Sequence, residues 1–287
     1  MTSPQPWARR ALLARLGVLG AVLSVESLLP PGLAAARPLD LLRPALSTLA
    51  RDTLNGLVAF VVPGQDEYSR AQGTPSASPG GLQAKGTDFL IEALDNFVPF
   101  PDQIARPLAA AFASGAADLP LPAVLHGPSD QQVSTVDKAL RSLLQNDETV
   151  PLSLVIALLL NLVGSQVNPL SLHGAFASPF SRLSFADKAR TFQLIEGGDA
   201  NLVATLDAGL PQPLRQSLSG LLKFVGGALL EFCAFGVFSE WAVYDKKNRQ
   251  LTARPVGWQL SGYQPAGPVE GWDELRGYYQ GRTEVRD

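Results

Sequence analysis

The chain has 287 residues, of which 46% are hydrophobic, and its formal net charge at pH 7 is -3. This length and apolar content fill one large domain or two small ones. No basic block stands out against the acidic residues, which argues against a nucleic-acid-binding surface. The single cysteine, Cys233, excludes an internal disulfide. It lies in the most apolar stretch, where we expect a buried, unreactive thiol.

The first 36 residues have the pattern of an export signal. Arg9 and Arg10 precede a modest apolar run, and Ala34 and Ala36 fit a small-residue cleavage site of the A-x-A type. The run has about ten apolar residues, whereas a membrane-spanning helix needs about twenty. The arginine pair favours twin-arginine export to the envelope, periplasm or medium, with membrane contact only through this segment. The alternative is an ordinary amphipathic N-terminal helix.

Residues 37–287 are expected to form a single helical domain. Apolar residues recur at three- and four-residue steps from 43 to 62, which predicts a helix that ends at Pro63. Residues 63–86 are rich in Pro, Gly and Ser, which predicts a long exposed loop. Thr87 is the expected N-cap of the next helix. By the same reasoning, further helices are expected at residues 102–114, 129–144, 152–163, 185–195 and 213–238, with a short one from Asp199.

Three of these helices carry particular expectations. Residues 152–163 are apolar on nearly every side but too few to span a membrane, which predicts a central core helix. Ser184 is the expected N-cap of the next helix, whose buried stripe is predicted to contain Phe185, Ala189, Phe192 and Ile195. No stretch shows convincing strand alternation, although residues 243–252 suit one small hairpin. The expected fold is an all-α, irregular bundle with a long buried C-terminal helix and an aromatic, mostly non-regular tail at 239–287.

The tail concentrates the aromatic residues of the chain. Three of the four tryptophans and four of the five tyrosines lie between Trp241 and Tyr279. Side chains with so much apolar area must pack on the domain's own helices or on another protein. Glu231, inside the apolar helix, is expected to be paired, to face solvent or to lie at a contact surface. The candidate partner-interface residues are Glu231, Trp241, Tyr244, Trp258, Tyr263, Trp272 and Tyr278.

No pattern of catalytic or cofactor-binding residues is present in the sequence. There is no Cys/His cluster with zinc-ligand spacing, no CxxCH, and no GxGxxG after a predicted strand. His126 and His173 lie in connecting stretches, where capping or hydrogen bonding is their simplest role. We therefore expect a protein that is not an enzyme and that binds no metal, haem or flavin by itself.

Four motifs occur in order along the chain. The first is the Arg9-Arg10 pair, and the second is Pro63-Gly64 followed by Ser78-Pro-Gly-Gly81 and Thr87-Asp-Phe89. The third is Phe180-x-x-Leu183-Ser184, with Asp187 and Phe192, and the fourth runs from Gly236-Val-Phe-Ser239 through Tyr244 to Gly257-Trp258-Gln-Leu-x-Gly262-Tyr263. In this order they are similar to motifs of the small-subunit family typified by gluconate 2-dehydrogenase subunit 3. The chain departs from the family pattern at Asp245-Lys-Lys-Asn248 and in a C-terminal extension that reaches Tyr279.

The resemblance implies a non-catalytic small subunit, or an export escort or chaperone, of a large flavin-dependent dehydrogenase of the glucose–methanol–choline type. In that case the partner carries the FAD, and the twin-arginine signal serves both chains. The alternative function is a free-standing exported helical protein that binds a lipid or sterol-like ligand between the helices at 152–163 and 218–238. An unrecognised enzyme is the least favoured class.

Overall fold

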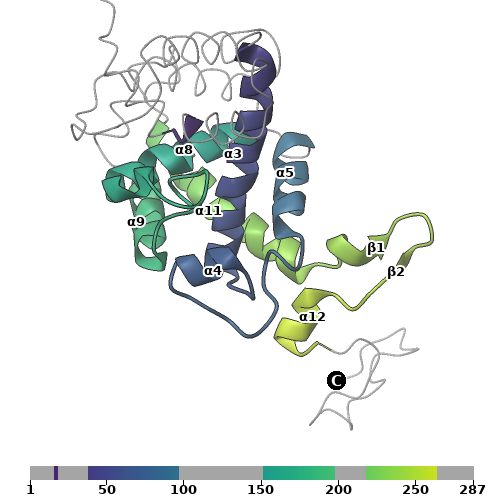
Figure 1. The fold of residues 1–287 in the computed structure, drawn as a ribbon. Coiled ribbons are helices and arrows are strands. Elements are labelled where there is room, and N and C mark those ends of the chain that lie inside the picture. Colours follow the sequence, from purple (N-terminus) through teal and green to yellow (C-terminus); the bar gives the residue numbers. More distant parts are fainter. Residues whose placement is uncertain (1–15, 19–37, 97–150, 198–217, 264–287) are drawn as a thin grey trace, which may run out of the picture.

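The structure is a computed structural model, and it describes residues 16–18, 38–96, 151–197 and 218–263 (Figure 1). The described chain is all-α with one small antiparallel sheet, which confirms the predicted fold class. Its α-helices are α3 (Pro38–Val61), α4 (Glu67–Ala71), α5 (Gly86–Asn96), α8 (Leu152–Val167), α9 (Phe185–Glu196), α11 (Leu218–Phe238) and α12 (Val256–Ser261). The short 3-10 helices η2 (Pro169–Leu172) and η4 (Trp241–Val243) and the strands β1 (Tyr244–Asp245) and β2 (Gln250–Leu251) complete it.

Helix α8 is the centre of the bundle. All its residues from Leu152 to Ser165 are buried, and α3, α5 and α9 pack against it. A helix enclosed in this way needs no polar face, which explains why its sequence is apolar on nearly every side. The prediction of a central core helix is confirmed. Among the residues that the structure describes, no helix is both long and apolar enough to cross a membrane.

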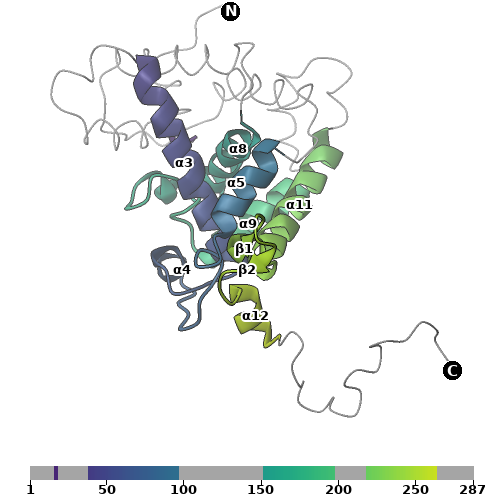
Figure 2. The same ribbon diagram turned by 90° about the vertical axis from the view of Figure 1, so that its right-hand side faces the viewer.

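Helix α11 packs against α9 and α5 along one face (Figure 2). That face buries Leu222, Val225, Leu229, Cys233 and Val237. The opposite face is open to solvent, so the helix that we expected to be buried is buried on one side only. Burial raises the pKa of the Cys233 thiol far above its ordinary value, as expected for an unreactive cysteine.

The prediction of an exposed loop at residues 63–86 is right for part of the segment and wrong for the rest. The segment contains α4, and it buries Tyr68, Ser69 and Gln72. The backbones at Gly64 and Gly80 touch, because a Cβ added to Gly64 would lie 2.6 Å from the Cα of Gly80. The composition predicted a loop because a high glycine content usually indicates a flexible backbone. Here glycine allows two backbone segments to meet.

Two details of the next helices also differ from expectation. Thr87 lies inside α5 and does not cap it, and its buried hydroxyl has no hydrogen-bond partner among the described residues. Ser184 is the N-cap of α9 as predicted, accepting a hydrogen bond from the backbone N–H of Asp187. The buried face of that helix, however, includes Lys188 and Thr191, whereas Phe185 stays 42% exposed.

The tail after α11 begins with η4 and the predicted hairpin. Strands β1 and β2 pair antiparallel, with Tyr244 opposite Leu251. The hairpin and α12 follow the C-terminal end of α11 and lie at the edge of the bundle (Figure 1). The expected helices at 102–114, 129–144 and from Asp199 lie outside the described residues, as do Arg9, Arg10, Ala34, Ala36, His126, Trp272 and Tyr278.

Candidate functional site

Exposed apolar side chains gather on α11 and the tail. The described residues expose seven large hydrophobic side chains, and five of them lie between residues 224 and 263. These are Phe224 (66% exposed), Phe235 (63%), Phe238 (47%), Tyr244 (45%) and Tyr263 (54%). Single exposed apolar residues are common, but a group of aromatic residues on one part of a surface marks a contact site.

The exposed face of α11 carries a stripe of residues three, four or seven positions apart. We call Phe224, Gly227, Glu231, Phe235 and Phe238 the α11 stripe. At 3.6 residues per turn these positions share one side of the helix, opposite the buried side. Glu231 is exposed and has no hydrogen bond or ion pair among the residues that the structure describes. The stripe is therefore an apolar surface with one unpaired carboxylate near its middle.

The beginning of the tail is packed on the α11 stripe through Phe89 of α5. The Phe89 ring lies 5.7 Å from that of Phe235 and meets Trp241 edge-on at 5.5 Å. Gly236 allows this approach, because a Cβ there would lie 2.8 Å from the Cγ of Phe89. Trp241 is half-buried by these contacts. Trp241 is therefore a predicted interface residue that packs on the protein's own helices.

Helix α12 brings Trp258 and Tyr263 next to the end of the stripe. Gly257 sits against the backbone of Phe238, where a Cβ would lie 2.6 Å from the Cα of that residue. The Trp258 indole N–H donates a 2.9 Å hydrogen bond to the carboxylate of Glu240. The Tyr263 ring packs edge-on against Trp258 with 5.2 Å between centroids. Trp258 is half-buried, while Tyr263 and Tyr244 are each about half exposed.

Phe224, Phe235 and Phe238 were not predicted as site residues. They lie in a helix that the sequence suggested was buried all round, because its two faces are equally apolar. The available signal was the position of Glu231, which marks the solvent side of α11. The three phenylalanines lie seven, four and seven residues from it.

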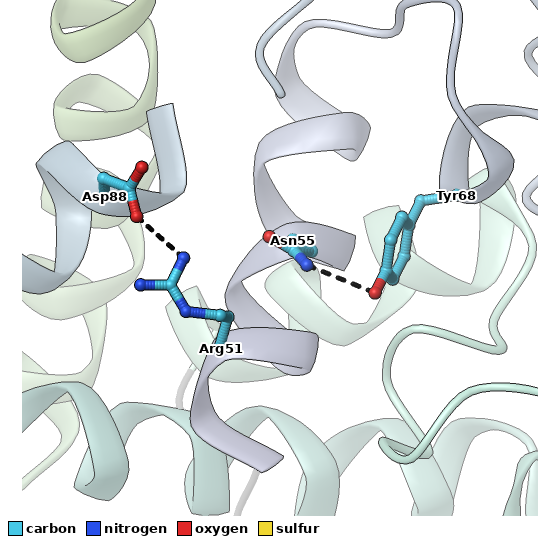
Figure 3. A network of polar contacts seen from close by, with 4 residues as sticks. All are labelled: Arg51, Asn55, Tyr68 and Asp88. Carbon is cyan, nitrogen blue, oxygen red and sulfur yellow. Dashed lines mark hydrogen bonds and ion pairs between the residues drawn. The ribbon is translucent and has the colours of Figure 1, made fainter. Parts of the chain in front are cut away.

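A second concentration of polar groups lies inside the bundle. The carboxylate of Asp52, on α3, accepts hydrogen bonds from the Tyr68 hydroxyl at 2.7 Å and from the Ser178 backbone N–H at 2.8 Å. Burial raises the pKa of Asp52, although these hydrogen bonds act in the opposite direction. Tyr68 also accepts a bond from Asn55, one turn along α3, as Figure 3 shows. These contacts join α3 to α4 and to the segment before α9.

Asn161 satisfies the polar groups around the middle of α8. Its side-chain oxygen accepts hydrogen bonds from the Ser178 hydroxyl at 2.6 Å and the Phe180 backbone N–H at 3.1 Å. Its amide nitrogen donates to the Thr53 hydroxyl at 3.1 Å and to the Leu16 carbonyl at 3.3 Å. A fully paired amide of this kind fixes the positions of the segments around it and leaves no group free for a ligand.

Lys188 is fully buried beside this network. Its ammonium donates to the Gln72 side-chain oxygen at 2.8 Å and to the Gly56 carbonyl at 3.1 Å, and it lies 5.5 Å from the centre of the Phe180 ring. Burial lowers the pKa of Lys188 to about 7, against the opposing effect of Asp52. An enclosed amine bonded to the protein's own carbonyl oxygens holds α9 to α3, which is a structural role.

The described residues offer little for metal or acid–base chemistry. His173 is exposed at the end of η2. Within residues 38–96, 151–197 and 218–263, no three His, Cys, Asp or Glu side chains are grouped closely enough to hold a metal ion. Helix α9 packs against both α8 and α11, the two helices expected to enclose an apolar ligand in the alternative function. The α11 stripe and the tail therefore remain the candidate site. Comparison of the chain with protein-family models, with curated proteins and with solved structures found no match.

Proposed function

We propose that the protein is a non-catalytic small subunit, or an export escort, of a large flavin-dependent dehydrogenase of the glucose–methanol–choline type that carries the FAD. The observation that carries this proposal is the row of exposed phenylalanines on α11, which the tail extends with Tyr244 and Tyr263. Aromatic side chains at this density are typical of protein interfaces. Inside the bundle, in contrast, the side chains of Asp52, Asn161 and Lys188 are paired with other groups of the protein.

The motifs behind the family resemblance also support the proposal. Gly64 and Gly80 touch, Gly236 receives Phe89, and Gly257 rests on α11. Ser184 begins α9. The motif residues thus occupy positions where packing restricts the choice of side chain, so their similarity concerns the fold and the placement of the tail.

Purification of the tagged full chain from its native host tests the proposal. We expect a complex that contains a large subunit and about one FAD per complex, with the absorbance of an oxidised flavin. The separated small chain is expected to contain no flavin, haem or metal. A preparation with no flavoprotein, or flavin bound to the isolated small chain, contradicts the proposal.

Truncation of one stripe residue makes the test quantitative. Phe224 is 66% exposed, so Phe224→Ala should leave the melting temperature nearly unchanged. At an interface hot spot the loss of this ring costs about 2 kcal/mol or more, or roughly a 30-fold weaker complex. Leu170→Ala is the matched control, because Leu170 is 82% exposed in η2, outside the stripe. If both variants bind the partner equally well, the interface does not include Phe224 and lies elsewhere on the protein.

A further inference from the structure

The chemistry of the α11 stripe restricts what can cover it. Glu231 lies seven residues from Phe224 and from Phe238, so a surface that covers all three phenylalanines also covers this carboxylate. A carboxylate taken out of water needs a cationic or hydrogen-bonding partner. None is present among the residues described by the structure. The covering surface must therefore supply it.

The stripe also has a gap between its side chains at Gly227, where a side chain is missing, and we call this gap the hollow. No heavy atom lies within 4 Å of a Cβ added there, whereas a Cβ on the neighbouring Gly226 would meet Glu196 at 2.9 Å. Gly227 and Phe235 flank Glu231 at equal distances along the helix, one without a side chain and the other with a large one. A helix packed on the stripe has room for a bulky side chain at Gly227.

A second copy of this chain is a poor occupant. In a two-fold contact centred on the stripe, each residue meets the residue placed symmetrically about the axis. The stripe is nearly symmetric about Glu231, so this arrangement puts the carboxylates of two copies opposite each other. Like charges in such positions oppose association. Charge complementarity instead favours a basic partner.

We propose that the α11 stripe seats a helix of the partner subunit, which places an arginine or lysine opposite Glu231 and a bulky apolar side chain in the hollow at Gly227. The identity of the partner rests on the proposed function. The side chains that the partner must supply are inferred from the stripe alone. Helix-on-helix contacts of this kind use anchors at three- and four-residue steps, which is the spacing of the stripe. A charge-assisted pair at Glu231 then fixes the register of the two helices.

A photo-cross-linking amino acid in place of Phe224 identifies the occupant in the complex purified from the native host. We expect the cross-linked peptide to come from a helix of the partner with an arginine or lysine about two turns away. A cross-link to a second copy or to another segment of the same chain overturns the proposal.

Charge reversal then tests the pairing. We expect Glu231→Lys to weaken the complex roughly 30-fold or more, as for a hot-spot residue, and reversal of the cross-linked helix's basic residue to glutamate to restore it. Gly227→Phe should weaken the complex by filling the hollow. Glu67→Lys, at an exposed position in α4, is the control that should bind normally.

The outcomes separate this proposal from the proposed function. If Glu231→Lys leaves a flavin-containing complex intact, the stripe is not the seat, while the proposed function stands. If the reversal and rescue succeed with a partner that contains no flavin, the stripe is the seat and the proposed function is wrong.

Discussion

Lys188 holds an ammonium group out of water, with no carboxylate at ion-pair distance among the described residues. Its pKa in the folded protein is lowered to about 7, and the ordinary value for an exposed lysine is 10.5. The folded state thus binds this proton less tightly than the unfolded state. Stability consequently rises as pH increases from about 7 towards 10.5, and the gain is lost as pH falls through 7.

Substitution of Lys188 by methionine should flatten this pH dependence. We expect the free energy of unfolding of the unmodified protein to rise by about 2 kcal/mol between pH 7.5 and 9.5. In Lys188→Met the rise should be absent, although loss of the bonds to Gln72 and Gly56 lowers stability at every pH. Urea denaturation between pH 7.5 and 9.5 measures the free energy of unfolding of both proteins. Lys246→Met, at an exposed lysine, should keep the slope; an unchanged slope in Lys188→Met contradicts the assignment.

Arg51 and Asp52 are neighbours on α3 with very different surroundings. Arg51 makes a 2.7 Å ion pair with Asp88 of α5, in which both side chains are about half exposed (Figure 3). Exposed ion pairs contribute little to stability, so Arg51→Ala should lower the free energy of unfolding by less than about 1 kcal/mol. Asp52→Asn removes the charge and leaves one acceptor atom, so it must either lose the bond from the Ser178 N–H or reverse the bond with the Tyr68 hydroxyl, and it should cost about 1.5–3 kcal/mol. Chemical denaturation of both variants checks the order, and equal losses would show that the buried pairing of Asp52 is unimportant.

At the scale of elements, two glycines of α11 should respond in opposite ways to alanine. Gly227 faces open space, so Gly227→Ala should stabilise the helix by about 0.5–1 kcal/mol. Gly236 receives the Phe89 ring, and Gly236→Ala should displace that ring and destabilise the fold by about 1–3 kcal/mol. Thermal unfolding of the two variants compares the same substitution in the same helix. A stabilised Gly236→Ala variant would show that α5 does not pack there as described.

Elements governed by local signals were predictable from the sequence. The apolar run of α8, the Ser184 cap and the hairpin needed only neighbouring residues, and each is present. The prediction of an exposed loop at 63–86 was wrong in part, because the fold of this segment depends on the contact of Gly64 with Gly80. Lys188 was missed because periodicity counts lysine as a solvent-facing residue. Burial of such a group depends on acceptors far away in the sequence, at Gln72 and Gly56.

The candidate site was predicted in part. The tail aromatics were identified from their number alone, and Trp258→Ala was expected to lower the melting temperature, by the roughly 3–5 kcal/mol of a fully buried tryptophan if Trp258 belonged to the core. The structure leaves Trp258 half-buried, bonded to Glu240, so a smaller loss is expected. The expectation that Trp272→Ala and Tyr278→Ala weaken partner capture without early melting concerns residues outside the described part. The exposure of the α11 stripe could not be predicted without knowing which face of α11 the other helices cover.

For the whole molecule, the proposed route of export gives a separate test. Changing Arg9 and Arg10 together to lysine keeps the charge but removes the arginine pair, so twin-arginine export should stop while a general secretory signal would tolerate the change. Cell fractionation of the double variant measures delivery. Normal envelope delivery of this variant contradicts the twin-arginine assignment.

The structure adds one observation on that segment. Leu16 and Val18, within the expected signal, are fully buried, and the Leu16 carbonyl accepts a hydrogen bond from Asn161. Cleavage after Ala36 would remove both apolar side chains from the core and leave that amide with one partner fewer. The N-terminal sequence of the exported protein shows whether the segment is removed.

The pairing of α3 with distant residues also determines when the protein can fold during synthesis. Asp52 and Gly56 receive their buried hydrogen bonds from Ser178, 126 residues later, and from Lys188, 132 residues later. At roughly 5–20 residues per second, α3 leaves the ribosome on the order of ten seconds before these partners are made. Until then these two buried hydrogen bonds cannot form, although α4, α5 and α8, which also pack on α3, have already been synthesised. Completion of this domain is therefore a late event in translation, and a chain that ends before Ser178 lacks the two residues that donate these hydrogen bonds to Asp52 and Gly56.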